Sequence, residues 1–414
     1  MVQSSKKLKV LFDHDGGVDD LLSLMMLLAM PHIDLVGVVV TPADCFLRPA
    51  VSASLKILRF FNRLDIELSE GTLHGVNPFP RAWRMHAYAI DALPILNQLP
   101  LSGKTLSKRD KSDLIGMPGL TNLSSEVPLD RAAFVDLKNR LQPKLEAKLS
   151  ADAADVEHQR RTLQELFEQV LAQESIVLSR VERKRLLAEL TQEIFQQLPG
   201  SLPTPLSEPG HEFIARKLRE ADEPLTILIT GPVSNLARTL ADAPDLVEKI
   251  EQVIWMGGAI NVEGNVRDYE HDGSAEWNAY WDPPSTYSLW QTAAPITLFS
   301  LDATNQVAVK PEFLHRLAQQ RAYPLSDLAG QCWVLTVGAI PSYEYIYFMW
   351  DTLTTGYLGA PQYMTFRQIR SQVVSYGPSA GRIKEVAEGG KLIQVAAEVD
   401  AEGFQNYLLE LFQS

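Results

Sequence analysis

Residues 8–30 read LKVLFDHDGGVDDLLSLMMLLAM, and this stretch decides how the chain is organised. The apolar run from Val10 to Phe12 is typical of a buried parallel strand, and Leu21 to Met30 has the near-continuous apolar pattern of a buried helix. A glycine turn joins them and carries four aspartates, Asp13, Asp15, Asp19 and Asp20. The stretch therefore predicts the strand, turn and helix of an α/β fold, with carboxylates at the end of the strand.

The four aspartates fall within eight residues and repel one another. A hard cation with oxygen ligands, calcium or magnesium, relieves this repulsion, and open α/β sheets bind ligands at the carboxyl ends of their strands. Two other interpretations stay open: a helix cap with a solvated turn, and a phosphatase-type nucleophile motif with two aspartates after a strand. Phosphatase chemistry needs a hydroxyl side chain soon after the second aspartate, where this chain has Gly16 and Gly17.

Composition narrows the class of protein. The 414 residues, 46% of them hydrophobic, can bury one large α/β core or two ordinary ones, and length alone does not decide between them. A formal charge of −13 argues against a nucleic-acid partner, and two cysteines are too few for a disulfide framework. No long apolar region precedes the first strand, and Leu21 to Met30 is too short to span a bilayer. We expect a cytoplasmic protein that does not engage a membrane.

Strand, loop and helix alternate along most of the chain. Further strands are expected at 33–41, 66–68, 225–230, 253–256 and 296–299, with helices at 52–61 and 403–413. This alternation predicts an α/β fold with a single open, mostly parallel, Rossmann-like sheet flanked by helices. Residues 104–208 differ because they contain no Trp or Tyr, are rich in helix-forming residues and end in LPGSLPTPLSEPG. We interpret 104–208 as a helical insertion into a catalytic domain of residues 1–103 and 209–414.

Polar and aromatic residues follow several of these strands. Asp44 lies in TPADCF, Trp83 ends the proline-containing loop GVNPFPRAWR, and Trp350 precedes Asp351 in MWDTLTTGYL. Each has a bland alternative, since a loop aspartate is common and a loop tryptophan usually packs. Trp277, Trp281 and Trp333 are assigned to core packing, Asn235 to a helix cap, and His14 to the strand face that points away from the aspartates.

The ordered set of motifs resembles the nucleoside hydrolase family, and within it the purine-specific group that prefers inosine, adenosine and guanosine. The likeness is carried by DHDGGVDD, TPADCF, VNPFPRAWR, DALPILN, TGPVSNLA, MGGA, GN, DGSAEWNAYWDP, FSLDATN and WDTLT. These motifs run in family order outside the insertion, and the match is less clear after Ala360.

The resemblance implies a role for each matching residue. It implies Ca²⁺ bound by Asp15, Asp20, Asp351 and the backbone carbonyl of Thr230, with Asp15 as the general base toward a metal-bound water that attacks C1′. The residues implied to bind the ribose are Asp19, Asn265, Glu276 and Asn278; Asp44 would contact the base, and Trp83 and Trp350 would sandwich the purine. Carboxylates suit this reaction because the sugar becomes oxocarbenium-like in the transition state.

Two departures from the family pattern stand out. Gly17 occupies a position where the group often has an asparagine that holds the ribose, and the insertion follows the loop that bears Trp83. The implied function is calcium-dependent hydrolysis of the N-ribosidic bond of purine nucleosides, in a homo-oligomer with a dimer favoured. The alternative is a non-catalytic nucleoside-binding or sensor protein that keeps the metal pocket. Assay of free base released from inosine discriminates between the two.

Overall fold

The computed structural model describes residues 6–74, 77–97, 131–146, 156–173, 202–339 and 346–413, together with positions 176, 178, 183, 186, 187 and 190. The chain divides into two compact units. The first comprises Met1–Asn97 and Thr204–Ser414, and the second comprises Gln98–Pro203.

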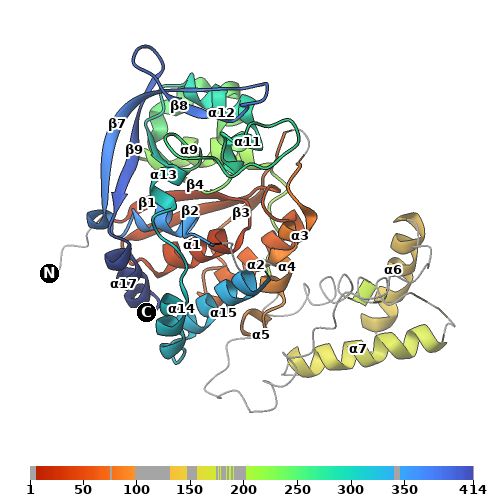
Figure 1. Cartoon of the computed structure of the whole chain (residues 1–414). Coiled ribbons are helices and arrows are strands. Elements are labelled where there is room, and N and C mark those ends of the chain that lie inside the picture. The colour runs from red at the N-terminus through yellow and green to blue at the C-terminus, as the bar shows by residue number, and fades with distance from the viewer. Residues whose placement is uncertain are drawn as a thin grey trace. The chain divides into compact units, whose positions relative to one another are not determined.

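The described part of the first unit is built on one nine-stranded sheet (Figure 1), whose order is β3-β2-β1-β4-β5-β6-β9-β7-β8. The strands are β1 (Leu8–His14), β2 (Ile33–Val40), β3 (Leu68–Glu70), β4 (Leu225–Ile229), β5 (Ile250–Met256), β6 (Ile296–Phe299), β7 (Met364–Val373), β8 (Ile383–Glu385) and β9 (Lys391–Val399). All pairs from β3 to β9 in this order are parallel, and β7 runs antiparallel to both β9 and β8.

Helices cover both faces of the sheet, with α1, α2 and α15 on one face and α9 and α12 on the other (Figure 1). The first-unit helices are α1 (Val18–Ala29), α2 (Leu47–Phe60), α3 (Arg81–Arg84), α4 (His86–Asp91), α5 (Pro94–Asn97), α9 (Gly210–Glu220), α10 (Ser234–Asp242), α11 (Trp277–Tyr280), α12 (Pro283–Trp290), α13 (Leu301–Thr304), α14 (Pro311–Gln319), α15 (Pro324–Ala339), α16 (Trp350–Gly356) and α17 (Ala401–Leu411), with 3₁₀ helices at Pro244–Lys249 and Pro361–Tyr363. None of the described helices combines the length and apolar character needed to cross a bilayer.

The architecture predicted from the sequence, a mostly parallel sheet between helices, is confirmed. The expected strand at 296–299 coincides with β6, and the helix expected at 403–413 is α17. Strands β7, β8 and β9 were not predicted. β7 alternates buried and exposed residues because it is antiparallel and only partly covered, whereas the central strands are buried on both sides and read as continuous apolar runs.

The turn between β1 and α1 is shaped by two glycines. Gly16 adopts a φ of +82°, and a Cβ there would lie 2.3 Å from the Cβ of Ala50. A Cβ on Gly17 would lie 2.3 Å from a carboxylate oxygen of Asp44. Glycine is therefore required at position 16 for its backbone conformation. At position 17 the absence of a side chain allows the carboxylate of Asp44 to approach the turn closely.

The second unit contains α6 (Arg131–Glu146) and α7 (Val156–Gln173) among its described residues. A cluster of its own, including Leu141, Leu163 and Phe167, is fully buried. Residues 204–208, which were expected to belong to the insertion, pack with the first unit, because the amide of Leu206 donates to the carbonyl of Leu68 at 2.9 Å. Position 104, the expected start of the insertion, lies outside the described residues.

Candidate active site

A cavity of about 410 Å³ lies at the carboxyl ends of the parallel strands, where an open α/β sheet places its ligand site. The residues predicted as site residues all line it: Asp15, Asp19, Asp20, Asp44, Trp83, Thr230, Asn265, Glu276, Asn278, Trp350 and Asp351. They come from loops and short helices that follow β1, β2, β3, β4 and β5 and from the starts of α1 and α16. The fold thus brings together side chains that are far apart in the sequence.

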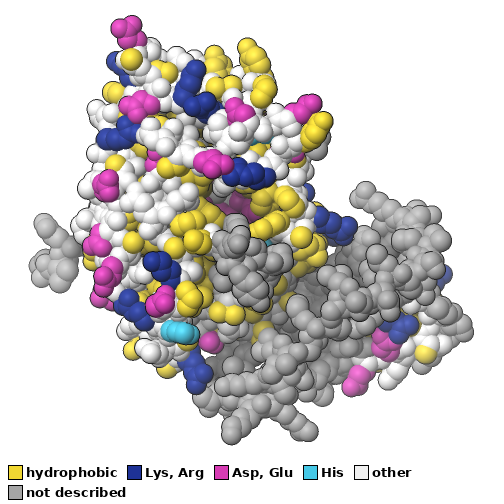
Figure 2. Space-filling model, viewed as in Figure 1, with side chains coloured by type: hydrophobic (Ala, Val, Ile, Leu, Met, Phe, Trp, Pro, Cys, Tyr) yellow, Lys and Arg dark blue, Asp and Glu magenta, His cyan; other side chains and the backbone are white. Residues whose placement is uncertain are grey.

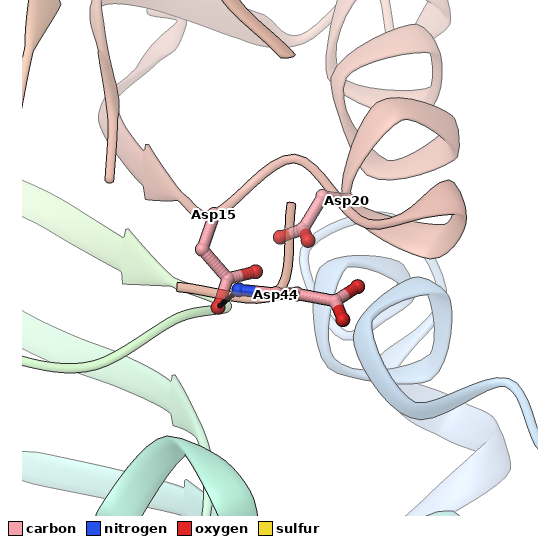
Figure 3. A group of neighbouring side chains, drawn as sticks. All are labelled: Asp15, Asp20 and Asp44. Carbon is pink, nitrogen blue, oxygen red and sulfur yellow. Dashed lines mark hydrogen bonds between the residues drawn. The ribbon is translucent and has the colours of Figure 1, made fainter. Parts of the chain in front are cut away.

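One end of the cavity is a cluster of carboxylates. Oxygens of Asp15, Asp20 and Asp44 lie within 4.8 Å of one another, and so do oxygens of Asp19, Asp20 and Asp351. Figure 3 shows Asp15 on the turn after β1 and Asp20 on the first turn of α1, with the Asp44 side chain beside them. Asp20 belongs to both groups and is therefore the centre of the acidic cluster.

Hydrogen bonds fix these carboxylates in place. Oδ2 of Asp15 accepts the backbone amide of Asp44 at 3.1 Å, and Oδ2 of Asp20 accepts the amide of Gly17 at 2.7 Å. The hydroxyl of Thr230 donates to the other oxygen of Asp20. The cluster is consequently preorganised by two backbone amides and one hydroxyl group from three separate segments.

Burial raises the pKa of every carboxyl group in the cluster. The pKa of Asp20 rises to about 7, and burial together with the charge of Asp20 raises the pKa of Asp15 well above its ordinary range. Burial, followed by the charge of Asp19, raises the pKa of Asp351 in the same way. Five acidic groups cannot all ionise here without a compensating cation.

The donor set fits a hard metal ion. The ligands on offer are buried carboxylate oxygens, and calcium and magnesium prefer oxygen. Among the described residues that line the cavity, Arg267 is the single arginine or lysine, and its guanidinium is bonded to Glu263 and to the carbonyls of Gly264 and Val266. The cluster therefore has no protein cation within the cavity to neutralise it.

The polar side chains next to the cluster are partly occupied by the protein itself. Glu276 caps α11 by accepting the amides of Asn278 and Ala279 and also accepts the amide of Gly258 at 2.8 Å. Burial raises the pKa of Glu276 to about 7. Nδ2 of Asn278 donates to the carbonyl of Thr230 at 3.0 Å. Glu276 therefore caps a helix and lines the cavity at the same time.

The rest of the cavity lining is largely aromatic and is called the aromatic end. Trp83 and Trp350 line it together with Phe79, Tyr347 and Phe348. Trp350 packs against the buried side chains of Met256, Ala259 and Leu301, and its indole Nε1 donates to Oδ1 of Asn305 at 3.0 Å. In Figure 2, acidic side chains are visible in a hollow that is bordered by hydrophobic side chains.

The assignment of Trp277 to core packing is wrong, because Trp277 is only partly buried and lines the cavity. Trp281 and Trp333 are buried, as expected, and Trp281 lines the cavity as well. Trp277 and Trp281 both pack edge-on against Phe79, at centroid distances of 4.9 and 5.3 Å. The signal for Trp277 was present in the sequence, because Glu276 and Asn278 flank it. Phe79, His86, Asn305 and Tyr347 also line the cavity without having been predicted. Phe79 and Asn305 lie within the motifs VNPFPRAWR and FSLDATN, whereas His86 and Tyr347 lie in none of the motifs quoted above.

A buried network supports the cluster from behind. Asn235, expected to cap a helix, instead donates to Oδ2 of Asp13 at 3.0 Å and to the hydroxyl of Thr41 at 2.8 Å. Thr41 also donates to Oδ1 of Asp13 at 2.9 Å. His14 is buried and stacks on Phe12, and it is not among the residues that line the cavity, as expected. The bonds from Asn235 to Asp13 and Thr41 thus link α10 to the ends of β1 and β2.

Comparison with known proteins agrees with the fold and identifies the family. A family model described as inosine-uridine preferring nucleoside hydrolase matches residues 10–406. The chain therefore belongs to this family, whose members are glycosidases that act on N-glycosyl bonds. The solved structure of an inosine-uridine preferring nucleoside hydrolase from Bacillus anthracis is 30% identical, with a TM-score of 0.68 over 98% of this chain and 99% of that chain.

Other similar proteins differ in their named preference. A pyrimidine-specific ribonucleoside hydrolase RihA from Klebsiella pneumoniae (strain 342) is 34% identical over 135 residues, which is 32% of this chain and 41% of that protein. The matched part thus spans about two fifths of that relative's length. A purine-preferring ribonucleoside hydrolase from Gardnerella vaginalis shares the fold, with a TM-score of 0.62, 19% identity and 98% coverage of each chain.

Proposed function

We propose that this protein is a calcium-dependent nucleoside hydrolase that prefers purine nucleosides and releases the free base and ribose. The observation that carries the proposal is the polarity of the cavity, with a carboxylate cluster at one end and Trp83 and Trp350 at the other. A nucleoside has the matching polarity, since its sugar carries hydroxyl groups and its base presents two π faces.

Ca²⁺ would be held by Asp15, Asp20, Asp351 and the carbonyl of Thr230. When bound, it positions a water molecule and lowers the pKa of that water. The resident carboxylates supply the remaining chemistry. Asp15 accepts a proton as general base, and the surrounding carboxylates stabilise the positive charge that develops on the sugar as the C1′–N bond breaks.

The ribose hydroxyls would be held by Asp19, Asn265, Glu276 and Asn278, and Asp44 would contact the base. The free Oδ1 of Asn278 can accept from a hydroxyl because its Nδ2 is already bonded to the carbonyl of Thr230. The Oδ1 of Asn265 accepts the amide of Trp277 at 3.1 Å, which leaves its NH₂ group as a donor. Between them, these two amides offer both kinds of partner that a hydroxyl needs.

The proposed preference for purines rests on Trp350, the residue before Asp351. The indole of Trp350 cannot donate a proton at neutral pH, so activation of the leaving base depends on stacking, and a purine offers a larger π face than a pyrimidine. Stacking contributes roughly 0.5–1.5 kcal/mol per contact beyond buried area, so two faces supply about tenfold to hundredfold discrimination. The pyrimidine-specific relatives named above match about a third of this chain, and uridine is therefore the competing substrate to assay.

The test is the release of free base from inosine, guanosine, uridine and cytidine by the purified protein, before and after exhaustive chelation and after calcium is restored. We expect inosine or guanosine to be hydrolysed with a kcat/KM at least tenfold above that of uridine, and activity to require the metal. Equal efficiency on uridine and inosine would overturn the purine assignment, and full turnover after chelation would overturn the metal assignment. Binding of inosine without any turnover would favour the non-catalytic nucleoside sensor.

We further propose that the helical second unit is an accessory module and that the protein is a homodimer. The second unit has a buried cluster of its own, which supports a separate fold. Replacing residues 98–203 with a Gly/Ser linker is expected to leave a folded, calcium-binding first unit. An insoluble or unfolded product would show that the segment is part of the catalytic core. Light scattering on both proteins tests the dimer.

A further inference from the structure

Tyr347 occupies the junction between the two ends of the cavity. Its side chain is buried with 8% exposure and lines the cavity. The backbone around it is fixed independently, because the amide of Val309 donates to the carbonyl of Tyr347 at 2.8 Å and the amide of Met349 donates to the carbonyl of Val307 at 2.8 Å. The position of this tyrosine is therefore set by the main chain and does not depend on its hydroxyl.

The side chain of Tyr347 contacts both ends of the cavity at once. Its hydroxyl donates to Oδ1 of Asp19 at 2.8 Å, and this bond joins residues 328 positions apart in the sequence. Its ring meets Trp350 edge-on, with centroids 4.8 Å apart and an interplanar angle of 67°. Asp19 is assigned to the ribose and Trp350 to the base, so Tyr347 joins the groups that would hold the two halves of one substrate.

The contact with Asp19 matters because Asp19 has two possible tasks. Its carboxylate lies with those of Asp20 and Asp351 in one of the two groups that can hold a metal ion. A carboxylate that rotates into a metal site is lost to the sugar. The phenol of Tyr347 and, at 3.4 Å, the amide of Asp351 donate to the two oxygens of Asp19 and fix its rotation.

We propose that Tyr347 is a positioning residue that holds Asp19 toward the ribose and keeps it from acting as a metal ligand. This inference rests on the proposed function. Removing the hydroxyl leaves Asp19 buried without its strongest donor, and the carboxylate then relaxes toward the nearest cation. The predicted signature is a loss of nucleoside affinity without a loss of metal affinity.

Tyr347→Phe removes the hydroxyl and keeps the ring against Trp350. Tyr280→Phe is the matched control, because the phenol of Tyr280 also donates to a carboxylate, that of Asp268, at 2.6 Å. Neither Tyr280 nor Asp268 lines the cavity. For wild type and both variants, calorimetry would give the dissociation constants of Ca²⁺ alone and of inosine with saturating Ca²⁺, and kinetics would give kcat and KM. Circular dichroism would verify the fold.

A hydrogen bond to a charged group contributes about 1.5–3 kcal/mol, which corresponds to a factor of roughly 10 to 100. We expect Tyr347→Phe to weaken inosine binding and raise KM about tenfold or more, with Ca²⁺ affinity unchanged or higher, and Tyr280→Phe to resemble wild type. An inosine affinity within twofold of wild type in Tyr347→Phe would overturn the inference. A parallel loss of Ca²⁺ and inosine affinity would also overturn it, because the substitution of a merely structural tyrosine would weaken both affinities.

A double-mutant cycle shows whether Tyr347 acts through Asp19. In an Asp19→Ala background, which already lacks the acceptor, Tyr347→Phe should change the inosine dissociation constant by less than twofold. A tenfold effect in that background would show that Tyr347 acts elsewhere and would overturn the inference. A wild-type protein that neither binds nor hydrolyses inosine would overturn the proposed function and this inference with it, whereas an active wild type with an indifferent Tyr347→Phe would overturn the inference alone.

Discussion

The two ends of the cavity are built in different ways. The carboxylate end is formed at the ends of β1 and β2 and on the first turns of α1 and α16, and its side chains accept hydrogen bonds from backbone amides. The aromatic end is formed largely by loop 77–80, the short helices α3 and α11 and residues 346–350, whose aromatic rings contact one another. Trp350 also packs against Met256 at the end of β5.

This difference has a physical consequence. The carboxylate cluster costs free energy to assemble, since burial raises the pKa of each of its acids, and a rigid sheet is needed to hold it. The aromatic walls gain free energy from their own packing, so loops and short helices suffice to hold them. We therefore expect substitutions at the carboxylate end to abolish or strongly reduce hydrolysis. Substitutions at the aromatic end should change the rate of hydrolysis of nucleosides with particular bases.

The largest effect is expected at the carboxylate end. Asp15→Ala should lower hydrolysis of inosine by about a thousandfold, because a positioned general base contributes roughly 10² to 10⁴ in rate. The variant should fold normally, and without metal it should be at least as stable as wild type, because a buried carboxylate with a raised pKa has been removed. Initial rates and thermal melts in chelator test both statements, with Asp268→Ala as the control outside the cavity. A rate close to that of wild type would show that another group is the base.

At the aromatic end, Trp83→Ala and Trp350→Ala should each lower kcat for inosine about tenfold, and the double variant about a hundredfold, since each removes one stacked face. Calcium affinity should stay unchanged because neither indole belongs to the carboxylate cluster. For p-nitrophenyl riboside, whose leaving group needs no protonation, kcat should fall much less than it does for inosine. Equal losses on both substrates would mean that the indoles act on the sugar, and the contrast between the two ends would fail.

The same contrast explains what the sequence could predict. Three aspartates of the first turn (Asp15, Asp19 and Asp20), Trp83, Trp350 and Asp351 were all predicted, because each follows a recognisable strand or stands in a distinctive motif. Every one of them lines the cavity. The fourth aspartate of the turn, Asp13, is buried against Asn235 and Thr41 instead. Parallel strands that are buried on both faces leave a clear apolar signal in the sequence, so the centre of the sheet was predictable as well.

The remaining features depend on tertiary contacts. Tyr347 reaches Asp19 through a bond between distant parts of the chain, and Asn235 bonds to Asp13 when local sequence suggested a helix cap. Trp277 was assigned to the core because an aromatic residue in a short helix usually packs. Strands β7 and β9 have exposed polar residues, so their pattern resembled a surface segment. The periodicity of apolar residues indicates which positions are buried. It does not indicate which distant side chain a residue contacts.

Stability should depend on pH in opposite ways with and without metal. Burial raises the pKa of Asp20 and Glu276 to about 7 in the folded protein, above their ordinary values near 4. Their contribution to stability is therefore complete below about pH 4 and is lost as the pH rises through 7. Metal-free protein should melt at a lower temperature at pH 8 than at pH 5.

Calcium should reverse this trend, because the ionised carboxylates bind it more tightly. At a hundredfold excess over the dissociation constant, binding adds about 2.7 kcal/mol, which for a chain of 414 residues is a melting-temperature rise of roughly 3 to 4 °C at pH 8. Thermal melts from pH 5 to 8, in calcium and in chelator, measure the difference. A calcium-induced rise that is largest at pH 5 would contradict the raised pKa values and the metal assignment.

The smallest effect is expected from the bond that orients Trp350. Asn305 accepts the indole N–H at 3.0 Å from an exposed position, and such a bond contributes about 0.5–1.5 kcal/mol, so Asn305→Leu should lower kcat for inosine roughly twofold to tenfold. Leucine keeps the size of the side chain and removes the acceptor. Trp350→Phe removes the donor instead, and if orientation is the cause, adding Asn305→Leu to it should have no further effect on kcat. Additive losses would show that Asn305 contacts the substrate directly, and the aromatic end would then include a polar contact to the base as well as its stacked faces.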